Sequence, residues 1–162
     1  MVLTFFIQIL RFDVPVGLAK QAGDSYPIAP QFSGTDLQGR SYSLDKYRRK
    51  DLVIYFWATW CPACRNEVRD VKKAYRLLRS EGVSFISVSL DKHRDTLQKF
   101  IKENQITYPV LFDGQGWNNQ IAKAYSIAAT PTVVVVDRLG KIQSTGHWIS
   151  EFAAVGFKKF RK

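Results

Sequence analysis

The two cysteines of the chain, Cys61 and Cys64, lie at the junction between a strand pattern and a helix pattern. Residues 52–56 before them form a continuous apolar run of strand length, Leu-Val-Ile-Tyr-Phe. After them, apolar residues recur at intervals of three and four as far as Leu78, which is the spacing of one buried helix face. The sequence therefore predicts that both sulfurs lie where a buried strand turns into a helix.

The start of a helix favours a thiolate, because the first backbone N–H groups have no partner and the helix dipole is positive there. Cys61 is expected near the N-cap, and Pro62 at the first helical position, where a missing N–H does no harm. Cys64 lies one turn further on, so its sulfur can reach that of Cys61. The pattern predicts an exposed, activated sulfur at Cys61 and a more buried resolving sulfur at Cys64, an arrangement suited to thiol–disulfide exchange.

Two other interpretations of the cysteine pair have less support. A structural disulfide would close a loop too short to gain much stability from chain entropy. A zinc or copper site needs further ligands, and the chain has no other cysteine. His93 and His147 are single and far apart in the sequence, which is typical of surface or core histidines. We therefore expect no metal and no other cofactor.

The run Trp57-Ala-Thr-Trp-Cys-Pro-Ala-Cys64, followed by Arg-Asn-Glu67 and later by Ala129-Thr-Pro-Thr132, resembles the TlpA/ResA branch of the thioredoxin superfamily. The resemblance extends from about residue 23 to residue 146, which is most of the chain. It implies a thioredoxin fold with an AhpC/TSA-type redoxin domain. It also implies protein-disulfide oxidoreductase activity without a cofactor, more in the direction of a reductase.

The resemblance also implies a substrate-binding edge. The bond between Thr130 and Pro131 would be cis and would face the cysteines, leaving the backbone of Thr130 open to an extended substrate segment. Trp60 and Pro62 would flank the reactive sulfur, with Trp60 shielding it. A proline before a buried strand is also typical of an ordinary trans strand-entry residue, and that alternative stays open.

Glu67 lies three residues beyond Cys64 and has two interpretations. It is either a solvent-facing helix residue or a partly buried acid that relays a proton to Cys64 or raises the cysteine pKa through its charge. Many thioredoxins carry a buried acid six residues before the first cysteine, and this chain has Tyr55 there. The chain thus departs from thioredoxin itself at this point.

The patterns taken in order predict an α/β protein with a central mixed sheet, helices on both sides and an N-terminal β-hairpin that turns at Gly39. The length of 162 residues fits one domain, over residues 23–162, preceded by a segment over residues 1–22. Strands are expected over residues 52–56, 83–90, 108–112, 132–136 and 141–145, and helices over 62–80, 96–105, 117–125 and from Ser150 onward.

Residues 1–10 are largely apolar, but a membrane-spanning helix needs about 20 such residues. The segment 1–22 is either a signal peptide, an anchor, the remnant of a longer N-terminus, or a buried element. We expect the protein in the bacterial periplasm or cell envelope, either free or membrane-anchored. A vicinal cysteine pair fits the cytoplasm as well, and that is the alternative.

The formal net charge of +10 favours acidic surroundings. The polar side of the helix after Cys64 forms a basic stripe of six residues, namely Arg65, Arg69, Lys72, Lys73, Arg76 and Arg79. The stripe is either an ordinary solvated face or a docking surface for an acidic partner or anionic membrane. No nucleic-acid motif is present. The expected partners are a protein disulfide or dithiol substrate and a membrane or soluble thiol electron donor, as in cytochrome c biogenesis.

Two other functions are alternatives to disulfide exchange. A peroxiredoxin-like peroxidase needs a threonine three residues before its reactive cysteine, whereas here Thr59 is two before Cys61 and Ala58 is three before. A non-catalytic module of thioredoxin fold would use the basic face to bind a metal or a partner. Both stay open as alternatives to the oxidoreductase.

Overall fold

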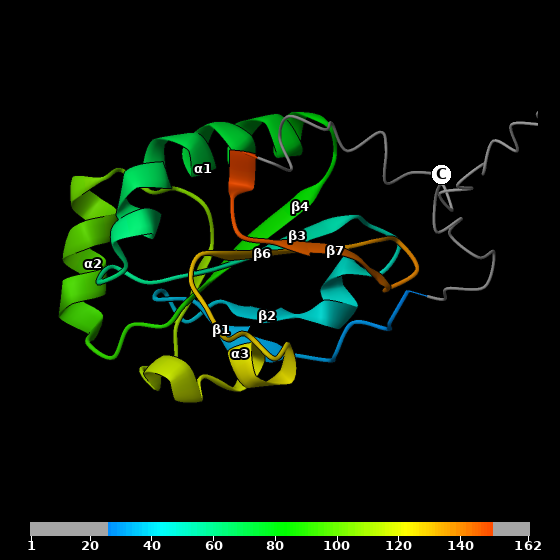
Figure 1. Ribbon diagram of the computed structural model, residues 1–162, viewed down its shortest axis with the longest axis horizontal. Helices are drawn as coiled ribbons and strands as arrows, with labels where there is room; N and C mark the ends of the chain where they lie inside the picture. The colour runs from blue at the N-terminus through cyan, green and yellow to red at the C-terminus, as the bar shows by residue number, and fades with distance from the viewer. Residues whose placement is uncertain (1–25, 151–162) are drawn as a thin grey trace, which may run out of the picture.

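The structure is a computed structural model that describes residues 26–150 of the chain (Figure 1). The expectations for residues 1–22 and for a helix continuing beyond Ser150 lie outside the described residues. The expected domain boundary between residues 22 and 23 lies outside them too, so it stays a prediction.

A five-stranded mixed sheet forms the centre of the molecule, in the order β5-β4-β3-β6-β7. The strands are β3 (Leu52–Trp57), β4 (Ser84–Ser89), β5 (Val110–Leu111), β6 (Thr132–Val136) and β7 (Ile142–Gly146). Strands β3, β4 and β5 pair in parallel, whereas β6 is antiparallel to both β3 and β7. The predicted α/β fold with a central mixed sheet is confirmed.

Helices lie on both sides of this sheet. Helix α1 (Pro62–Ser80) covers one face, and α3 (Gln120–Ala124) lies on the opposite side together with the hairpin of β1 (Ser33–Thr35) and β2 (Ser41–Ser43) (Figure 1). Helix α2 (Arg94–Glu103) connects β4 to β5, and two short 3-10 helices complete the described elements, η1 (Leu44–Tyr47) and η2 (Gly116–Asn118). None of the helices in the described part is both long and apolar enough to span a membrane.

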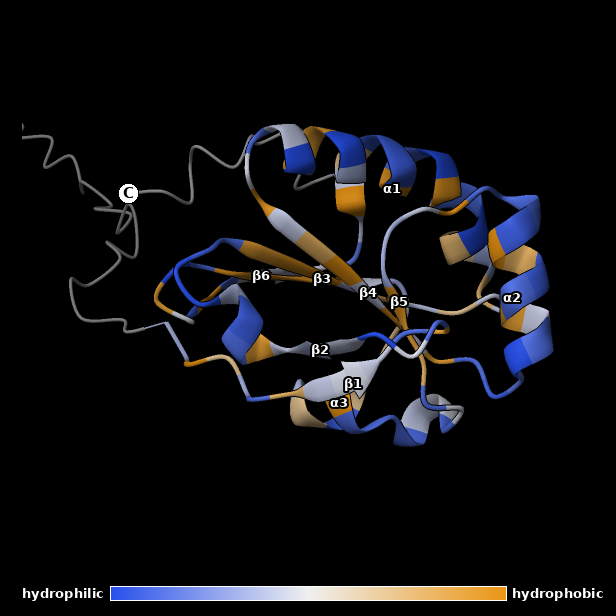
Figure 2. Cartoon of the chain, turned by 180° about the vertical axis from the view of Figure 1, so that it is seen from behind, coloured by the Kyte–Doolittle hydropathy of each residue, from blue (hydrophilic) through white to orange (hydrophobic). Residues whose placement is uncertain are grey.

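The core is centred on β3 and β6, in which every residue is buried. A strand covered on both faces needs a continuous apolar run, and the two strands supply one as Leu-Val-Ile-Tyr-Phe-Trp and Thr-Val-Val-Val-Val. Apolar residues concentrate along these strands, and the outer sides of the helices are hydrophilic (Figure 2). The sheet therefore provides a rigid base for the loops at its ends.

The antiparallel pairing of β3 with β6 determines which loops meet. Phe56, near the end of β3, pairs with Thr132, the first residue of β6. The segment after β3 and the segment before β6 consequently lie at the same edge of the sheet. These are the segments that carry the cysteines and the Thr130–Pro131 bond.

The expected single helix over residues 117–125 is divided into η2 and α3, so that prediction is wrong in its continuity. The division falls at Asn119, which has non-helical backbone and accepts a hydrogen bond from the N–H of Ala122 through its side chain, at 3.0 Å. Asparagine is a strong N-cap because its side chain replaces a missing helical acceptor. It therefore begins a new helix instead of continuing the first.

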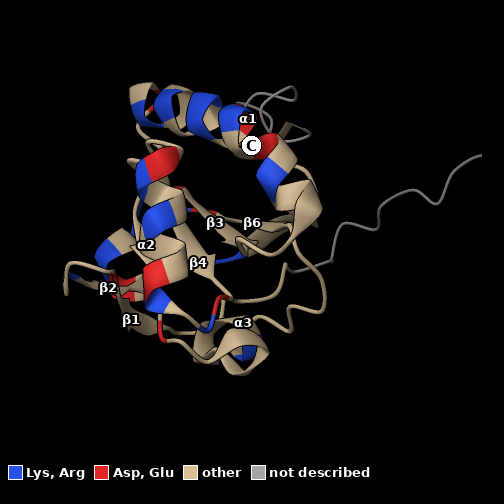
Figure 3. Ribbon diagram, turned by 90° about the vertical axis from the view of Figure 1, so that its left-hand side faces the viewer, with Lys and Arg blue, Asp and Glu red and all other residues tan. Residues whose placement is uncertain are grey.

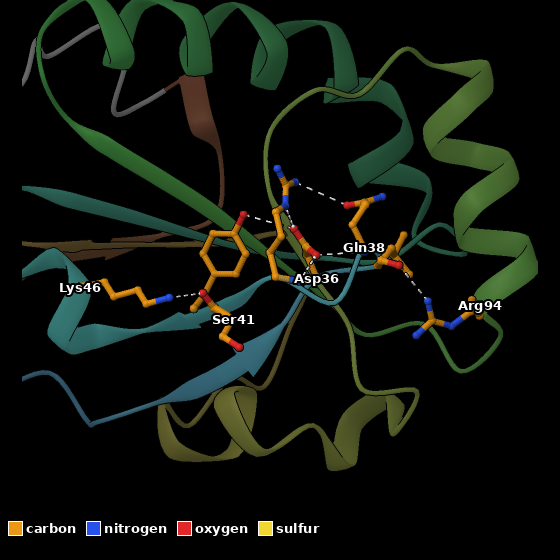
Figure 4. A network of polar contacts seen from close by, with 8 residues as sticks. Asp36, Gln38, Ser41, Lys46 and Arg94 are labelled. Carbon is orange, nitrogen blue, oxygen red and sulfur yellow. Dashed lines mark hydrogen bonds and ion pairs between the residues drawn. The ribbon is translucent and has the colours of Figure 1, made fainter.

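The hairpin turn is organised by Asp36, which is buried (Figure 4). Its carboxylate accepts backbone N–H groups of Gln38 and Arg40 at 2.9 Å and the Arg40 Nε at 2.6 Å. The Tyr42 hydroxyl donates to it at 3.2 Å. Arg94, at the start of α2, donates to a carbonyl of the turn and connects the hairpin to the main domain.

Candidate active site

Cys61 is the N-cap residue of α1, and Cys64 follows one turn later. Both are free thiols, and the backbone N–H of Cys64 points at the Sγ of Cys61 at 3.2 Å. The side chains are 4% and 1% exposed, so the prediction of an exposed Cys61 is wrong. The loop before β6 closes over it, and the carbonyl of Thr130 lies 3.4 Å from the Cys61 sulfur.

The two thiols lie in different electrostatic environments. Burial raises the pKa of the Cys64 thiol to about 12, and its hydrogen-bonding contact with Cys61 acts in the same direction. Cys64 therefore keeps its proton at neutral pH. The Cys61 sulfur, in contrast, receives a backbone N–H at a helix N-terminus, where negative charge is favoured.

The peptide bond between Thr130 and Pro131 is cis, as the resemblance implied. Pro131 is buried directly before β6 and faces the start of α1 through the contact between Thr130 and Cys61. His147, directly after β7, places its Nδ1 3.2 Å from the carbonyl oxygen of Pro131. Sequence reasoning treated His147 as an ordinary surface or core residue, although a hairpin turning at residues 137–140 already returns it to this edge.

Glu67 is buried on the inner side of α1, so the solvent-facing interpretation is wrong. Its Oε1 accepts a hydrogen bond of 2.7 Å from the hydroxyl of Tyr55 in β3. Burial raises the pKa of Tyr55 and of Tyr108, and negative charge on Glu67 or Cys64 raises both further. These four groups thus form one buried cluster beneath α1, and sequence reasoning missed the bond between Tyr55 and Glu67.

A second buried carboxylate, Asp91, supports the loop that precedes Cys61. It accepts the Thr59 backbone N–H at 3.1 Å, the Thr59 hydroxyl at 2.5 Å and the Ser89 hydroxyl at 2.7 Å. The role of Asp91 was not predicted from the sequence, because its partners come from separate strand ends. Its position directly after a buried strand was the available signal.

Trp60 and Pro62 both lie on the rim of the site. The Trp60 side chain is 51% exposed, its Nε1 donates to the Leu90 carbonyl at 3.4 Å, and its ring centroid lies 5.9 Å from that of Trp117. The two rings line a cleft that also includes His93. Pro62 is the exposed first residue of α1. Whether Trp60 shields the sulfur stays a prediction.

The outer side of α1 is strongly basic (Figure 3). Arg65 is exposed on it, one residue beyond Cys64, and Lys73 pairs with Asp70 at 3.8 Å. Lys72 donates to the carbonyl of Asn104 at 2.8 Å and so joins α1 to the end of α2. The solvated and partner-docking interpretations of this face both stay open.

Within residues 26–150, no group of three or more His, Cys, Asp or Glu side chains could hold a metal ion. The chemistry that the described site offers is that of its two thiols, the buried acid and the backbone around Pro131. These groups suit transfer of a disulfide between sulfur atoms.

Comparison with known proteins supports the same chemistry. The curated protein "Thiol-disulfide oxidoreductase ResA" of Geobacillus thermodenitrificans is 31% identical over 115 residues, which are 71% of this chain and 64% of that protein. "Sporulation thiol-disulfide oxidoreductase A" of Bacillus subtilis is 28% identical over 147 residues, covering 88% of this chain and 87% of that protein. The chain thus spans less than two thirds of the length of the first relative and most of that of the second.

Among solved structures, the thioredoxin domain of a thiol-disulfide oxidoreductase from Bacteroides vulgatus superimposes with a TM-score of 0.72 at 26% identity. The alignment covers 84% of this chain and 96% of that domain, so the thioredoxin fold is confirmed. The family model of the AhpC/TSA family matches residues 27–145, which include both cysteines and Pro131. Because this match extends over most of the sequence, the chain belongs to the AhpC/TSA family.

Proposed function

We propose that the protein is a thiol–disulfide oxidoreductase that reduces disulfides of protein substrates through Cys61 and Cys64. The observation that carries the proposal is the asymmetric pair of free thiols at the start of α1. The Cys61 sulfur accepts a helix N-terminal N–H, whereas the buried Cys64 keeps its proton. Cys61 is thus the attacking sulfur, and Cys64 is the resolving sulfur that reacts in the second step.

The exchange takes place in two displacements. The Cys61 thiolate attacks one sulfur of the substrate disulfide; that disulfide breaks, its second sulfur leaves as a thiolate and takes a proton, and a mixed disulfide forms. Cys64 then loses its proton and attacks the Cys61 sulfur, which releases the other substrate thiolate and leaves a Cys61–Cys64 disulfide. Two electrons pass from the dithiol to the substrate, and a thiol donor restores the dithiol.

The neighbouring residues have roles in this scheme. The backbone of Thr130, presented by Pro131, pairs with an extended substrate segment next to the Cys61 sulfur. Trp60 and Pro62 form the rim that such a segment crosses. Glu67, one turn beyond Cys64, accepts the proton that Cys64 gives up.

We extend the proposal to partners and compartment. Its substrates are envelope proteins with exposed disulfides, such as apocytochromes c, and its reductant is a membrane or soluble thiol donor. The protein acts in the bacterial periplasm or cell envelope, free or anchored through residues 1–22, with the cytoplasm as the alternative. The relatives named as thiol-disulfide oxidoreductases support the exchange chemistry. A peroxidase has less support, because the Thr59 hydroxyl is bound to Asp91.

The test uses the substitution Cys64→Ser, which removes the resolving sulfur. A mixed disulfide between Cys61 and the native substrate should accumulate in cells and run as a larger band on non-reducing gels. Cys61→Ser is the matched control and should trap nothing. The absence of any adduct, together with failure of the wild-type protein to reduce the disulfides of insulin, would refute the oxidoreductase assignment.

The direction of transfer is tested by the reduction potential in glutathione buffers. A reductase should have a potential nearer that of thioredoxin, about −270 mV, than that of a strong oxidant such as DsbA, about −120 mV. A value at the oxidising end would reverse the direction and leave the exchange chemistry in place.

A further inference from the structure

We infer that Tyr55 is a positioning residue for the exchange, because its hydroxyl holds the Glu67 carboxylate beside Cys64 as a proton acceptor. The inference rests on the proposed function, since it concerns the step in which Cys64 loses its proton. It adds a residue on the central strand to a reaction whose other groups lie on α1 and in the loop before β6.

Tyr55 is held rigidly in the middle of the sheet. It lies in β3 between Ser87 of β4 and Val133 of β6, and its side chain is 1% exposed. Its ring stacks with those of Trp57 and Phe85, each at a centroid distance of 6.4 Å. The hydroxyl therefore has a fixed position relative to the helix above it.

That fixed hydroxyl reaches across the interface between sheet and helix to Glu67. The distance of 2.7 Å between the Tyr55 hydroxyl and Glu67 Oε1 is that of a strong O–H···O hydrogen bond. Glu67 and Cys64 are three residues apart on α1, a spacing that places two side chains next to each other on one helix face. The phenol thus anchors the carboxylate on the side of the helix that carries the resolving thiol.

The neutrality of the donor matters for proton transfer. A buried carboxylate without a hydrogen-bond donor prefers its protonated form, and a donor shifts the preference back toward the anion. An arginine donor would stabilise the anion so strongly that it no longer served as a base at neutral pH. Tyr55 donates without adding charge, and burial keeps its own proton in place because it raises the pKa of the phenol.

Other titratable and charged groups also lie around Glu67. Tyr108 lies in the segment before β5, and negative charge on Glu67 or Cys64 raises its pKa. Its ring packs against those of Tyr75 and Phe85. The cations of α1 lie on the outer side of the helix (Figure 3). The hydrogen bond of 2.7 Å to the Glu67 carboxylate comes from Tyr55 of β3.

The test compares Tyr55→Phe with Tyr108→Phe, since each removes one buried hydroxyl from the same cluster and keeps the ring. The readout is the rate at which Cys64 resolves a preformed mixed disulfide with glutathione, measured from pH 5 to pH 9. Without its donor, Glu67 should bind its proton more tightly. The rising limb of the pH profile should then move to higher pH by about one unit in Tyr55→Phe. At a fixed pH on that limb, the reaction should be about tenfold slower. In Tyr108→Phe the shift should be less than about 0.3 unit.

Glu67→Gln provides the background that isolates the coupling. In that variant the carboxylate is absent, so adding Tyr55→Phe should leave the profile unchanged. A carbon-13 NMR titration of the Glu67 carboxyl, which reports its protonation independently of activity, should show the same upward shift in Tyr55→Phe. Because the NMR titration does not depend on activity, it also tests the inference if Tyr55→Phe lowers the stability of the protein.

The outcomes separate the two proposals. If wild-type protein resolves the mixed disulfide, but Tyr55→Phe has the wild-type profile and the wild-type Glu67 titration, the positioning role is wrong and the oxidoreductase stands. An equal shift in the Glu67→Gln background would also overturn the positioning role, because the effect would then not pass through the carboxylate. If the wild-type protein resolves no mixed disulfide at any pH, the proposed function fails.

Discussion

Asp36 in the hairpin and Glu67 in α1 are both buried carboxylates, 3% and 6% exposed, but different donors satisfy them. Asp36 accepts two backbone N–H groups, the Arg40 guanidinium and the Tyr42 hydroxyl (Figure 4). Glu67 accepts the neutral hydroxyl of Tyr55. The comparison is therefore between a carboxylate bound to a guanidinium and one that accepts a hydrogen bond from a phenol.

The donors of Asp36 make it a permanent anion. Burial opposes ionisation, but the hydrogen bonds and the charge of Arg40 lower the pKa of Asp36 below its ordinary value of 3.8. A group that never takes up a proton at neutral pH can hold a turn together but cannot relay protons. A neutral donor, in contrast, leaves a carboxylate free to exchange its proton with a neighbouring thiol.

The largest expected effect is that of Asp36→Ala on stability. The substitution removes the acceptor for two amides and a guanidinium, so the free energy of unfolding in urea should fall by about 2–3 kcal/mol. The rate of disulfide exchange by the folded protein should not change. If Asp36→Ala greatly lowered the rate of disulfide exchange and left the stability unchanged, the assignment of Asp36 to a purely structural role would be wrong.

The acid dependence of unfolding provides a second check on Asp36. Because its pKa is lowered in the folded protein, its stabilisation is fully present above the ordinary pKa of 3.8 and is lost as the pH falls through the lower folded value. Asp36→Asn should therefore unfold with a weaker pH dependence than wild type in this acid range. Parallel curves for the two proteins would show that Asp36 is not a stabilised anion.

An intermediate effect is expected for Glu67→Gln, which keeps an acceptor for Tyr55 but loses the acid. The resolving step should slow by about tenfold near neutral pH, equivalent to about 1.4 kcal/mol in the barrier. The pH dependence of Cys61 alkylation by iodoacetamide should also change, whereas the free energy of unfolding should stay within about 1 kcal/mol of wild type. An alkylation profile that matches wild type would return Glu67 to a purely structural role.

The smallest effect should come from Arg40→Gln. The Arg40 side chain is 65% exposed, so its ion pair with Asp36 is partly screened by solvent. The backbone donors of the turn remain, so the free energy of unfolding should fall only slightly. The difference from wild type should shrink in 1 M NaCl, measured by urea unfolding. A salt-independent loss would indicate that packing of the side chain matters more than its charge.

The parts of the fold that sequence predicted well depend on local chemistry. The strand before the cysteines was expected over residues 52–56 and is Leu52–Trp57, because a continuous apolar run is typical of a strand covered on both faces. The helix after it ends at Ser80, next to Gly82, whose φ of 74° is one that a side chain would disfavour. The C-terminal end of α1 thus follows from a single nearby residue.

The parts that it missed depend on contacts between distant segments. The hydrogen bond from Tyr55 to Glu67 and the contact of His147 with Pro131 require the placement of helices and the register of strands. The burial of Cys61 has the same origin, since the covering residue Thr130 is 69 positions away. Periodicity describes one element at a time and does not say which face meets which partner.

The register of β6 on β3 has a consequence for how the chain between them can change. Phe56 lies opposite Thr132, and this pairing brings Pro131 to the same end of the sheet as Cys61. A slip by two residues, the smallest that keeps the same side chains inward, would move Pro131 by about 6–7 Å and separate it from the sulfur. Insertions in the exposed loops between these two strands would lengthen the chain without changing this alignment, provided that the helices and strands between them are kept.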